Sequence, residues 1–369
     1  MKIRMYECCF GDCFRLVKKG HKDLFVDFGI HEYTCSKSER EKRFNNIIND
    51  MGEEKDQKEF LLTHYHSDHF NGVLYMVKYS KHKFSDVYIP DIWNIKYRVQ
   101  AYALLLLKDV LNNDKIENNL TIIDFLESIC TTNGNIHFVK RGSIFHDEQF
   151  IALWPSKKFI DKKIKHLYDD LAEKFGGNLN KINELAYRLI EIMSNYQKQT
   201  EQNHTSLLNE VKEDFLLLKT EFDSKYSTNQ SKNTSRKLNE LGNQISIVFQ
   251  NYTKDRNVLF TGDFGMKRNW NYIEKNKDGN VNMHNEYEVI KVPHHGTKRY
   301  YHSFDEKTNE RSILMIPNGN NRKNWSIDTQ YVLDSHSLKY KTICDCSNKC
   351  SVPMCVNCRN IKKYSFLDI

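Results

Sequence analysis

One stretch of the chain carries three histidines and an aspartate within six residues: Leu61-Leu62-Thr63-His64-Tyr65-His66-Ser67-Asp68-His69-Phe70-Asn71-Gly72. The apolar residues before the cluster predict a buried strand, which disfavours a chance group of solvated histidines. Side chains two residues apart on a strand point the same way, so His64 and His66 share one direction. Asp68 and His69 belong to the next turn and point at a second position nearby. The two directions predict two adjacent metal sites. Imidazole and carboxylate ligands suit zinc, manganese or iron better than calcium.

The composition is that of a polar protein that still buries a core. The chain has 369 residues, a hydrophobic fraction of 39% and a mean hydropathy of -0.68, enough for one large domain with insertions or for two domains. The net charge of +7 favours an anionic partner. Charges within Met1–Glu7 exclude a signal peptide there, and the apolar run Ala101–Leu107 is too short to span a bilayer. We therefore expect a cytoplasmic protein with no membrane partner.

The composition changes at Pro155 and divides the chain. Residues 157–240 contain no proline, and their apolar spacing is typical of amphipathic helices. We expect this stretch to be a helical insertion between the two parts of one fold, residues 1–156 and 241–340. A separate tail follows at 341–369.

The insertion has two interpretations. It packs on the domain as a structural element, or it serves as a substrate lid or an arm for a protein partner. Within it, the polar run Ser227–Ser235 predicts a linker.

Further candidate ligands follow two other predicted strands. Asp263 comes just after Gly262 at the end of an apolar strand, where a glycine lets the backbone turn sharply and exposes the carboxylate. His294 and His295 end the predicted strand 288–293. Each group alone is a weak signal, but together with the histidine cluster they form a converging set from three strand ends.

The spacing His64-x-His66-x-Asp68-His69-x-x-Gly72 resembles the signature of the metallo-β-lactamase fold, a group of mostly two-metal hydrolases. Gly11-Asp12-Cys13-Phe14 and Val26-Asp27-Phe28-Gly29 are similar to the opening of that domain in DNA-uptake (competence) proteins and their free-standing relatives. The resemblance implies an α/β, four-layer αββα fold. It also implies two divalent ions, Zn²⁺ in preference to Mn²⁺.

The resemblance also implies roles for individual residues. Asp263 would bridge the two ions and, with Asp68, act as a catalytic residue. Asp27 would brace the metal-binding loop, while we expect Asp12 and Cys13 to serve the turn and the core. The full set of implied ligands is His64, His66, Asp68, His69, Asp263 and one of His294 and His295.

The chain departs from the family in two places. Relatives commonly carry another histidine one hairpin before the bridging aspartate, whereas residues 242–246 contain none. This leaves the His64 and His66 site open to water or substrate, or weakly filled by Asn243. Relatives also often have Gly-His-Pro where this chain has residues 323–326, Lys-Asn-Trp-Ser.

Basic residues follow each predicted strand end that carries ligands. They are Lys298, Arg299, Arg322, Lys323, Lys267 and Arg268. Their shared location favours an anionic substrate, with the first three as candidate substrate-binding residues. The leading hypothesis is a hydrolase of phosphodiester bonds in nucleic acid or a nucleotide, using a water activated between two cations. The alternative is a weakly active or inactive nucleotide- or nucleic-acid-binding sensor of a bacterial defence-type system.

The tail concentrates cysteines in a chain that has ten of them. Cys344, Cys346, Cys355 and Cys358 could supply four thiolates to an additional structural zinc, with Cys350 as a substitute or spare. The alternative is a set of free thiols in a loosely ordered tail. Because clustered thiols in a reducing compartment more often hold metal than form disulfides, zinc is the preferred interpretation.

Overall fold

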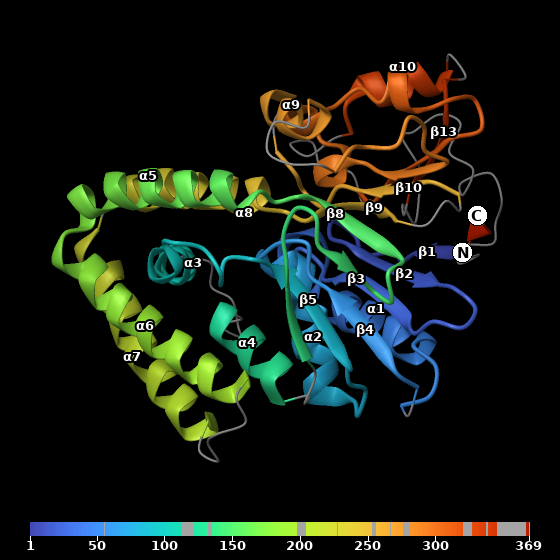
Figure 1. Cartoon of the computed structure of the whole chain (residues 1–369). Helices are drawn as coiled ribbons and strands as arrows, with labels where there is room; N and C mark the ends of the chain where they lie inside the picture. The colour runs from blue at the N-terminus through green and yellow to red at the C-terminus, as the bar shows by residue number, and fades with distance from the viewer. Residues whose placement is uncertain are drawn as a thin grey trace.

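The computed structural model shows an α/β protein whose strands form two mixed sheets flanked by helices (Figure 1). The described residues are 1–54, 56–111, 121–131, 135–197, 204–226, 228–252, 256–265, 267–275, 281–319, 327–336, 339–344 and 367–368. Within these segments, every helix is too short or too polar to cross a bilayer.

The first sheet is built mainly from the first part of the chain. Its strands, in spatial order, are β14 (Leu367–Asp368), β1 (Lys2–Met5), β2 (Cys13–Val17), β3 (Asp23–Phe28), β4 (Lys58–Leu61), β5 (Asp86–Pro90) and β6 (Asn135–Val139). The strands from β14 to β3 pair antiparallel, and those from β3 to β6 pair parallel. The described end of the chain therefore returns to pair with its first strand.

The second sheet repeats this arrangement. Its strands, in spatial order, are β13 (Lys341–Cys344), β12 (Ile313–Ile316), β11 (Val289–Lys291), β10 (Val258–Phe260), β9 (Val248–Asn251), β8 (Phe150–Trp154) and β7 (Ile144–Phe145). Pairing is antiparallel from β7 to β10 and parallel from β10 to β13. Parallel strands share the direction of their carboxyl ends, so the loops after β10 and β11 emerge side by side.

Alternating apolar residues of both sheets meet in one hydrophobic cluster. Phe14 and Leu61 come from the first sheet, and Phe249 and Phe260 from the second. The rings of Phe14 and Phe260 pack edge to face with their centroids 5.4 Å apart. Because strand side chains alternate between faces, the remaining apolar residues of each sheet must be covered on the other side.

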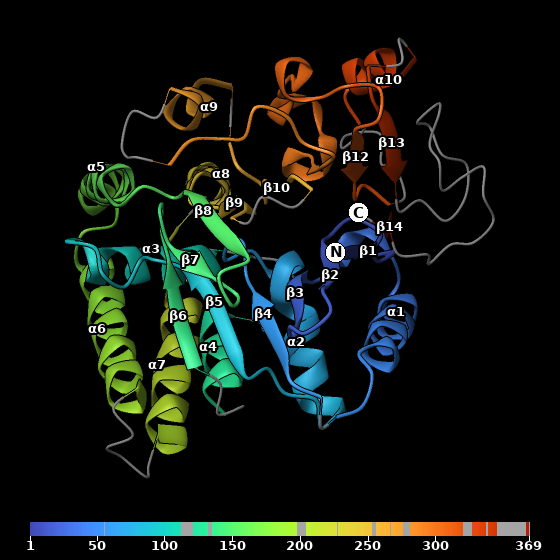
Figure 2. The same cartoon turned by 45° about the vertical axis from the view of Figure 1, so that its right-hand side comes forward.

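Helices provide that cover. A second cluster joins strands of the first sheet to α1 (Lys37–Asp50), α2 (Ser67–Tyr79) and α4 (Ile122–Thr131). A third joins strands of the second sheet to α9 (Lys267–Glu274) and α10 (Thr329–His336). Figure 2 shows α9 and α10 beyond the second sheet, and α1 and α2 beside the first.

Helices also fill the stretch in which the sequence predicts an insertion. They are α5 (Lys157–Phe175), α6 (Gly177–Gln197), α7 (His204–Lys225) and α8 (Thr228–Gln244). All of them contact α3 (Arg98–Leu111), whose residues from Ala101 to Leu107 are buried, so α3 anchors the insertion to the domain.

The linker predicted at Ser227–Ser235 is wrong, because α8 begins at Thr228. Tertiary contacts override the polar composition there. Thr234 is buried and accepts a hydrogen bond from the Lys174 ammonium at 2.6 Å, while Leu238 and Leu241 join the hydrophobic cluster of the first sheet. The last residues of α8 carry the chain back to the candidate site.

Candidate metal centre

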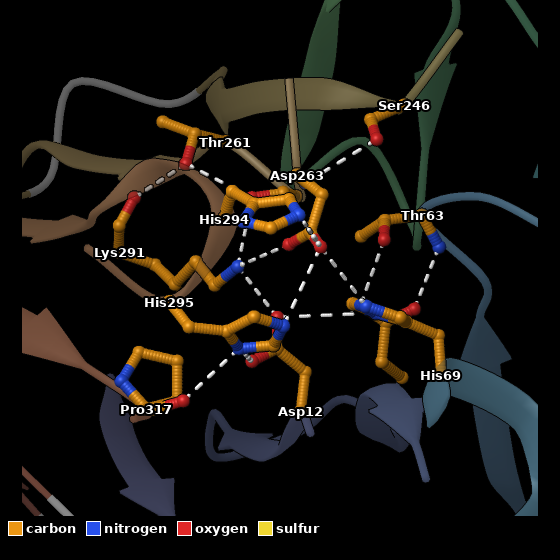
Figure 3. Close-up of polar contacts among 12 residues, drawn as sticks. Asp12, Thr63, His69, Ser246, Thr261, Asp263, Lys291, His294, His295 and Pro317 are labelled. Atoms are coloured by element: carbon orange, nitrogen blue, oxygen red, sulfur yellow. Dashed lines mark hydrogen bonds and ion pairs between the residues drawn. The ribbon is translucent and has the colours of Figure 1, made fainter. Parts of the chain in front are cut away.

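The candidate ligands lie in the segments that follow three strands, with Asp68 and His69 in the first turn of α2. The first histidines follow β4, Asp263 follows β10, and His294 and His295 follow β11 (Figure 3). Gly262, with φ of +51°, makes the turn before Asp263. His294 and His295 themselves have positive φ angles of 45° and 55°, a backbone conformation that is unusual for residues other than glycine. The tertiary structure therefore fixes an unfavourable backbone at the point where these imidazoles enter the site.

One carboxylate oxygen is the focus of the cluster. The Oδ2 atom of Asp263 lies 3.4 Å from the Nε2 atom of His69 and 3.4 Å from that of His295. It lies 3.8 Å from His294 Nε2 and 4.0 Å from His64 Nε2. The structure thus brings imidazoles from two segments, after β4 and after β11, around a carboxylate from a third, after β10.

Several overlapping groups have donor atoms within 4.8 Å of one another and could hold a metal ion. They are His64, His69 and Asp263; Asp68, His69 and His295; Asp12, Asp263 and His295; and Asp12, Asp27 and His69. The overlap is compatible with one ion or two. His295, but not His294, belongs to these groups among the described residues, although both reach Asp263.

The outer nitrogens of the imidazoles are hydrogen-bonded. His69 Nδ1 lies 2.9 Å from Asp27 Oδ2, His295 Nδ1 lies 3.0 Å from the Pro317 carbonyl oxygen, and His294 Nδ1 lies 2.8 Å from Thr297 Oγ1. For His69 and His295 the partner is an acceptor, so the Nδ1 atom carries a proton and donates it. The neutral form of these rings then presents the Nε2 lone pair to Asp263, which is the arrangement that metal-ligating histidines adopt.

The surroundings of the imidazole Nε2 atoms indicate whether the residues fit a metal ion. The Nε2 atoms of His66, His69 and His295 are buried and make no hydrogen bond with the described residues, although those of His69 and His295 lie at ion-pair distance, 3.4 Å, from Asp263 Oδ2. A buried imidazole nitrogen without a partner costs free energy, because it has lost its hydrogen bond to water. For His69 and His295 a cation next to Asp263 would remove this cost, and the donor set of imidazoles and carboxylates suits a transition metal. The residues therefore fit a metal ion.

His64 and His66 face each other at the other side of the cluster. His64 Nε2 and His66 Nδ1 are 2.9 Å apart, and His64 Nδ1 lies 3.1 Å from Thr63 Oγ1. The Thr63 hydroxyl donates its proton to Asp27 Oδ2 at 2.7 Å, so it accepts from His64 Nδ1. His64 Nε2 is then the unprotonated nitrogen of its ring and is directed at the site.

Asp27 has the bracing role that the resemblance implies. Its Oδ1 atom accepts a hydrogen bond from the Thr63 backbone amide at 2.7 Å, and its Oδ2 atom accepts from His69 Nδ1. The residue is 1% exposed and has a φ of +55°. Gly29 lies against the backbone of the same loop, where a Cβ atom would come within 2.3 Å of the Asp68 carbonyl carbon. These contacts fix the loop from behind.

The charges of the cluster without metal are divided between protonated and neutral rings. Burial lowers the pKa of His64 and of His66 well below its usual value. Burial also opposes the charged form of His295, but Asp263 and Asp12 outweigh it and raise the pKa of His295 to about 10. Asp27 and Asp263 likewise raise the pKa of His69 well above its usual value. A metal ion must therefore displace protons from the rings that lie closest to Asp263.

The sequence missed two charged residues of the cluster, Asp12 and Lys291. The expectation that Asp12 serves only the turn and the core is wrong, since its carboxylate lies 3.2 Å from His295 Nδ1 and 2.5 Å from Lys291 Nζ. Lys291 is 1% exposed and also lies 3.3 Å from Asp263 Oδ1. A signal was available for Lys291, because a lysine within the apolar strand 289–293 is a charge at a buried position.

The predicted substrate-binding residues have different surroundings. Lys298 and Arg299 are exposed at the edge of the site, and Arg299 pairs with Glu240 of α8 at 2.8 Å. Asn243 is buried and donates a hydrogen bond to the Tyr300 hydroxyl at 3.1 Å. The Tyr300 ring stacks on His294 with centroids 3.9 Å apart, so Asn243 reaches the site through an aromatic pair.

Other predictions lie outside the described residues. These are the side chains of Lys267 and Arg268, the loop with Arg322 and Lys323, the side chain of Cys344, and Cys346, Cys350, Cys355 and Cys358. The proposed thiolate zinc site and four of the six basic residues at the edge therefore stay predictions.

The chain matches no protein-family model and no curated protein. The fold and the site therefore rest on the chain's own residues: two mixed sheets flanked by helices and a buried histidine and aspartate cluster are consistent with a metallo-β-lactamase-like fold.

Proposed function

We propose that the chain is a metal-dependent hydrolase with the four-layer αββα arrangement of the metallo-β-lactamase fold. The observation that carries the proposal is the position of Asp263 Oδ2, which lies within 4.0 Å of the Nε2 atoms of His64, His69, His294 and His295. Side chains from three loops converge there. The sharing of hydrophobic residues between the sheets, with helices beyond each, supports the layered arrangement.

The residues divide into two sets around Asp263. His64, which forms a group with His69 and Asp263, would hold one ion, whereas His66 is hydrogen-bonded to His64 and belongs to none of the ligand groups among the described residues. Asp68, His69 and His295 would hold the other, since their donor atoms lie within 4.8 Å of one another. Divalent ions bound there would lower the pKa of a water molecule to near neutrality and polarise an oxygen of the substrate.

The protein's own groups prepare this chemistry. Asp27 and the Pro317 carbonyl hold the His69 and His295 rings in one orientation, which keeps their Nε2 atoms directed at the site. His294 is the most exposed of the imidazoles near Asp263, at 21%. It therefore marks the side from which a substrate reaches the cluster.

The substrate that fits best is a phosphodiester of nucleic acid or of a nucleotide. The basic net charge and the exposed Lys298, four residues after His294, support an anionic substrate. Arg299 supports it less, because Glu240 already neutralises its guanidinium. A positive edge would stabilise charge that develops on a phosphoryl group during attack.

A second candidate is a sensor that binds nucleotide or nucleic acid and signals through the insertion. The contact between His66 and α8 favours it. A Cβ atom on Gly242 would lie 2.5 Å from His66 Nε2, so the end of α8 abuts a candidate ligand directly. Movement of α8 would then alter the site, and ligand binding would alter the insertion.

Metal analysis combined with a substrate panel tests the proposal. The panel contains a phosphodiester, single-stranded and duplex nucleic acid, a thioester and a β-lactam, each assayed with zinc and with manganese. We expect phosphodiester hydrolysis that requires metal and is lost in Asp263→Ala. The control is His137→Ala, an exposed histidine that pairs with Asp86 outside the cluster. Metal binding without hydrolysis of any substrate would favour the sensor.

Salt dependence tests the substrate class. If Lys298 contacts a phosphate of duplex DNA, Lys298→Ala lowers the slope of log affinity against log salt by about 0.9. Arg299→Ala is the matched control with a smaller expected effect, because Arg299 is already paired. Equal slopes in all three proteins would return small neutral substrates to first place.

A further inference from the structure

A lysine is buried behind the candidate metal centre. Lys291 is the last residue of β11 and is 1% exposed. Its ammonium donates a hydrogen bond to the Gly262 carbonyl oxygen at 2.7 Å and lies 2.5 Å from Asp12 Oδ2 and 3.3 Å from Asp263 Oδ1 (Figure 3). Burying an ammonium is expensive unless such partners surround it, and an apolar side chain would avoid the expense altogether. Packing therefore does not account for a lysine at this position.

The Lys291 ammonium gives the two oxygens of Asp263 different surroundings. Oδ1 faces Lys291, whereas Oδ2 faces the imidazoles of His69 and His295. The backbone of Asp263 is held as well, because its amide donates to Ser246 Oγ at 3.2 Å and the preceding carbonyl accepts from Lys291. A carboxylate held in this way presents one oxygen to the site and cannot rotate to present both.

The same ammonium reaches His295 through Asp12. One oxygen of Asp12 lies next to Lys291 and the other lies 3.2 Å from His295 Nδ1. Asp12 is fully buried, so its charge needs the ammonium. The chain from Lys291 through Asp12 to His295 thus adds to the Pro317 carbonyl in fixing the direction of the His295 ring.

We propose that Lys291 is a positioning residue of the metal centre, which holds Asp263 to a single ligand oxygen and, through Asp12, orients His295. The inference rests on the proposed function, because it assumes that Asp263 and His295 bind metal. It assigns to β11 two tasks: its last side chain orients the ligands from behind, and the loop that follows it supplies His294 and His295.

The test uses a variant that removes the ammonium without changing the net charge of the cluster. Lys291→Met combined with Asp12→Asn loses one positive and one negative charge, so the net charge of the cluster is conserved. Because Asp12 is itself a candidate ligand, Asp12→Asn alone is measured beside the double variant, and the effect of Lys291 is the difference between the two. The Pro317 carbonyl still accepts the proton of His295 Nδ1, and the Oδ1 atom of Asp263 is released. The probe is Co²⁺, whose visible absorption reports the number and geometry of its ligands.

We expect the double variant to bind Co²⁺ about 10 to 100 times more weakly, the range for losing a residue that orients a metal ligand. We also expect its absorption band to weaken and shift, because Asp263 can then present both oxygens. A role confined to stability would lower the melting temperature and leave the spectrum unchanged.

A second buried lysine provides the matched control. Lys58 is also 1% exposed, but its ammonium donates to the backbone carbonyl oxygens of Glu53 and Asp56 at 2.7 and 2.8 Å, at the start of β4 and away from the cluster. Lys58→Met should lower the melting temperature and keep both the affinity and the spectrum of Co²⁺.

The outcomes separate this inference from the proposed function. Wild-type affinity and absorption in the double variant would overturn the inference alone. A wild-type protein that binds no Co²⁺ would overturn both. If the double variant does not fold, Lys291→Gln, which keeps a hydrogen-bond donor without the charge, undergoes the same measurement and is judged by the same two results.

Discussion

The first sheet carries a buried group of histidine and carboxylate at each end of β4, and the two groups differ. At the amino end, Glu59 accepts from the Tyr88 hydroxyl at 2.9 Å and lies 2.8 Å from His146 Nδ1 and 3.4 Å from Lys22 Nζ. At the carboxyl end, His69 and His295 are equally buried, and their Nε2 atoms, with those of His64 and His294, lie within 4.0 Å of the single oxygen Asp263 Oδ2. Burial of histidine and acid together is thus no mark of a metal site; the convergence of several imidazole nitrogens on one carboxylate oxygen is.

The largest expected difference between the two groups is in activity. His69→Ala should reduce metal-dependent hydrolysis below detection, because His69 belongs to three of the candidate ligand groups. His146→Ala, at the other end of the strand, should keep both metal and activity in the folded protein. Metal content and initial rates of the two variants make the comparison, and equal behaviour would remove the distinction drawn above.

The pH should strongly affect metal binding by the group at the carboxyl end of β4, which contains His69 and His295. The metal-free pKa of His295 is raised to about 10, and a metal ligand must be unprotonated, so protons compete with the ion below that pH. We expect the affinity for Zn²⁺ to rise about tenfold per pH unit for each proton displaced, through the neutral range and up to about pH 10. Competition with a chelator of known affinity at several pH values measures this slope.

The metal-free protein should respond to pH in the opposite direction. A raised pKa contributes stability that is complete below the ordinary histidine value of 6.5 and is lost as pH rises through about 10. The melting temperature of the chelated protein should therefore fall from neutral pH to pH 10, while the stabilisation by added metal grows. A metal effect that shrinks with rising pH would contradict the assignment of His295.

Asp27 gives an intermediate effect on metal binding. Asp27→Asn keeps the shape of the side chain and removes the charge that His69 Nδ1 faces at 2.9 Å. The loss expected for such a partner of a metal ligand is about 10- to 100-fold in metal affinity. Calorimetric titration of the variant with Zn²⁺ measures it, and an unchanged affinity would show that Thr63 and Gly29 suffice to hold the loop.

The smallest effect on metal binding is expected for Glu59, in the group at the amino end of β4. Glu59→Gln should lower the free energy of unfolding by about 1 to 3 kcal/mol, because it weakens a buried hydrogen-bonded ion pair. Affinity for metal should not change. Urea unfolding of the chelated protein gives the first quantity and titration gives the second; a loss of metal in this variant would mean that the two ends of β4 are coupled.

The sequence could predict the ligands whose environment is local. Asp263 and His294 follow the neighbouring parallel strands β10 and β11, whose following segments emerge at one edge of the sheet. His64 follows β4 of the other sheet, so its convergence with Asp263 was implied by the family resemblance and not by strand pairing.

The sequence could not predict contacts that depend on distant partners. Lys291 and Asp12 are far apart in the chain, and nothing near either residue indicates the other. Ser227–Ser235 is polar and was predicted as a linker, but α8 gains its stability from Lys174 and from apolar residues later in the helix. In both cases the deciding contact forms only once the chain has folded.

Metal stoichiometry tests the central claim most directly. Purified protein, stripped with a chelator and dialysed against Zn²⁺ or Mn²⁺, is analysed for bound metal beside the Asp263→Ala variant. Cys346, Cys350, Cys355 and Cys358 are replaced by serine in both proteins, so that the predicted thiolate site does not contribute to the count while β13 and β14 are kept. The overlapping ligand groups around Asp263 predict up to two ions per wild-type chain and a loss of metal in the variant. Absence of bound metal in the wild type, or equal metal in both proteins, would contradict the account.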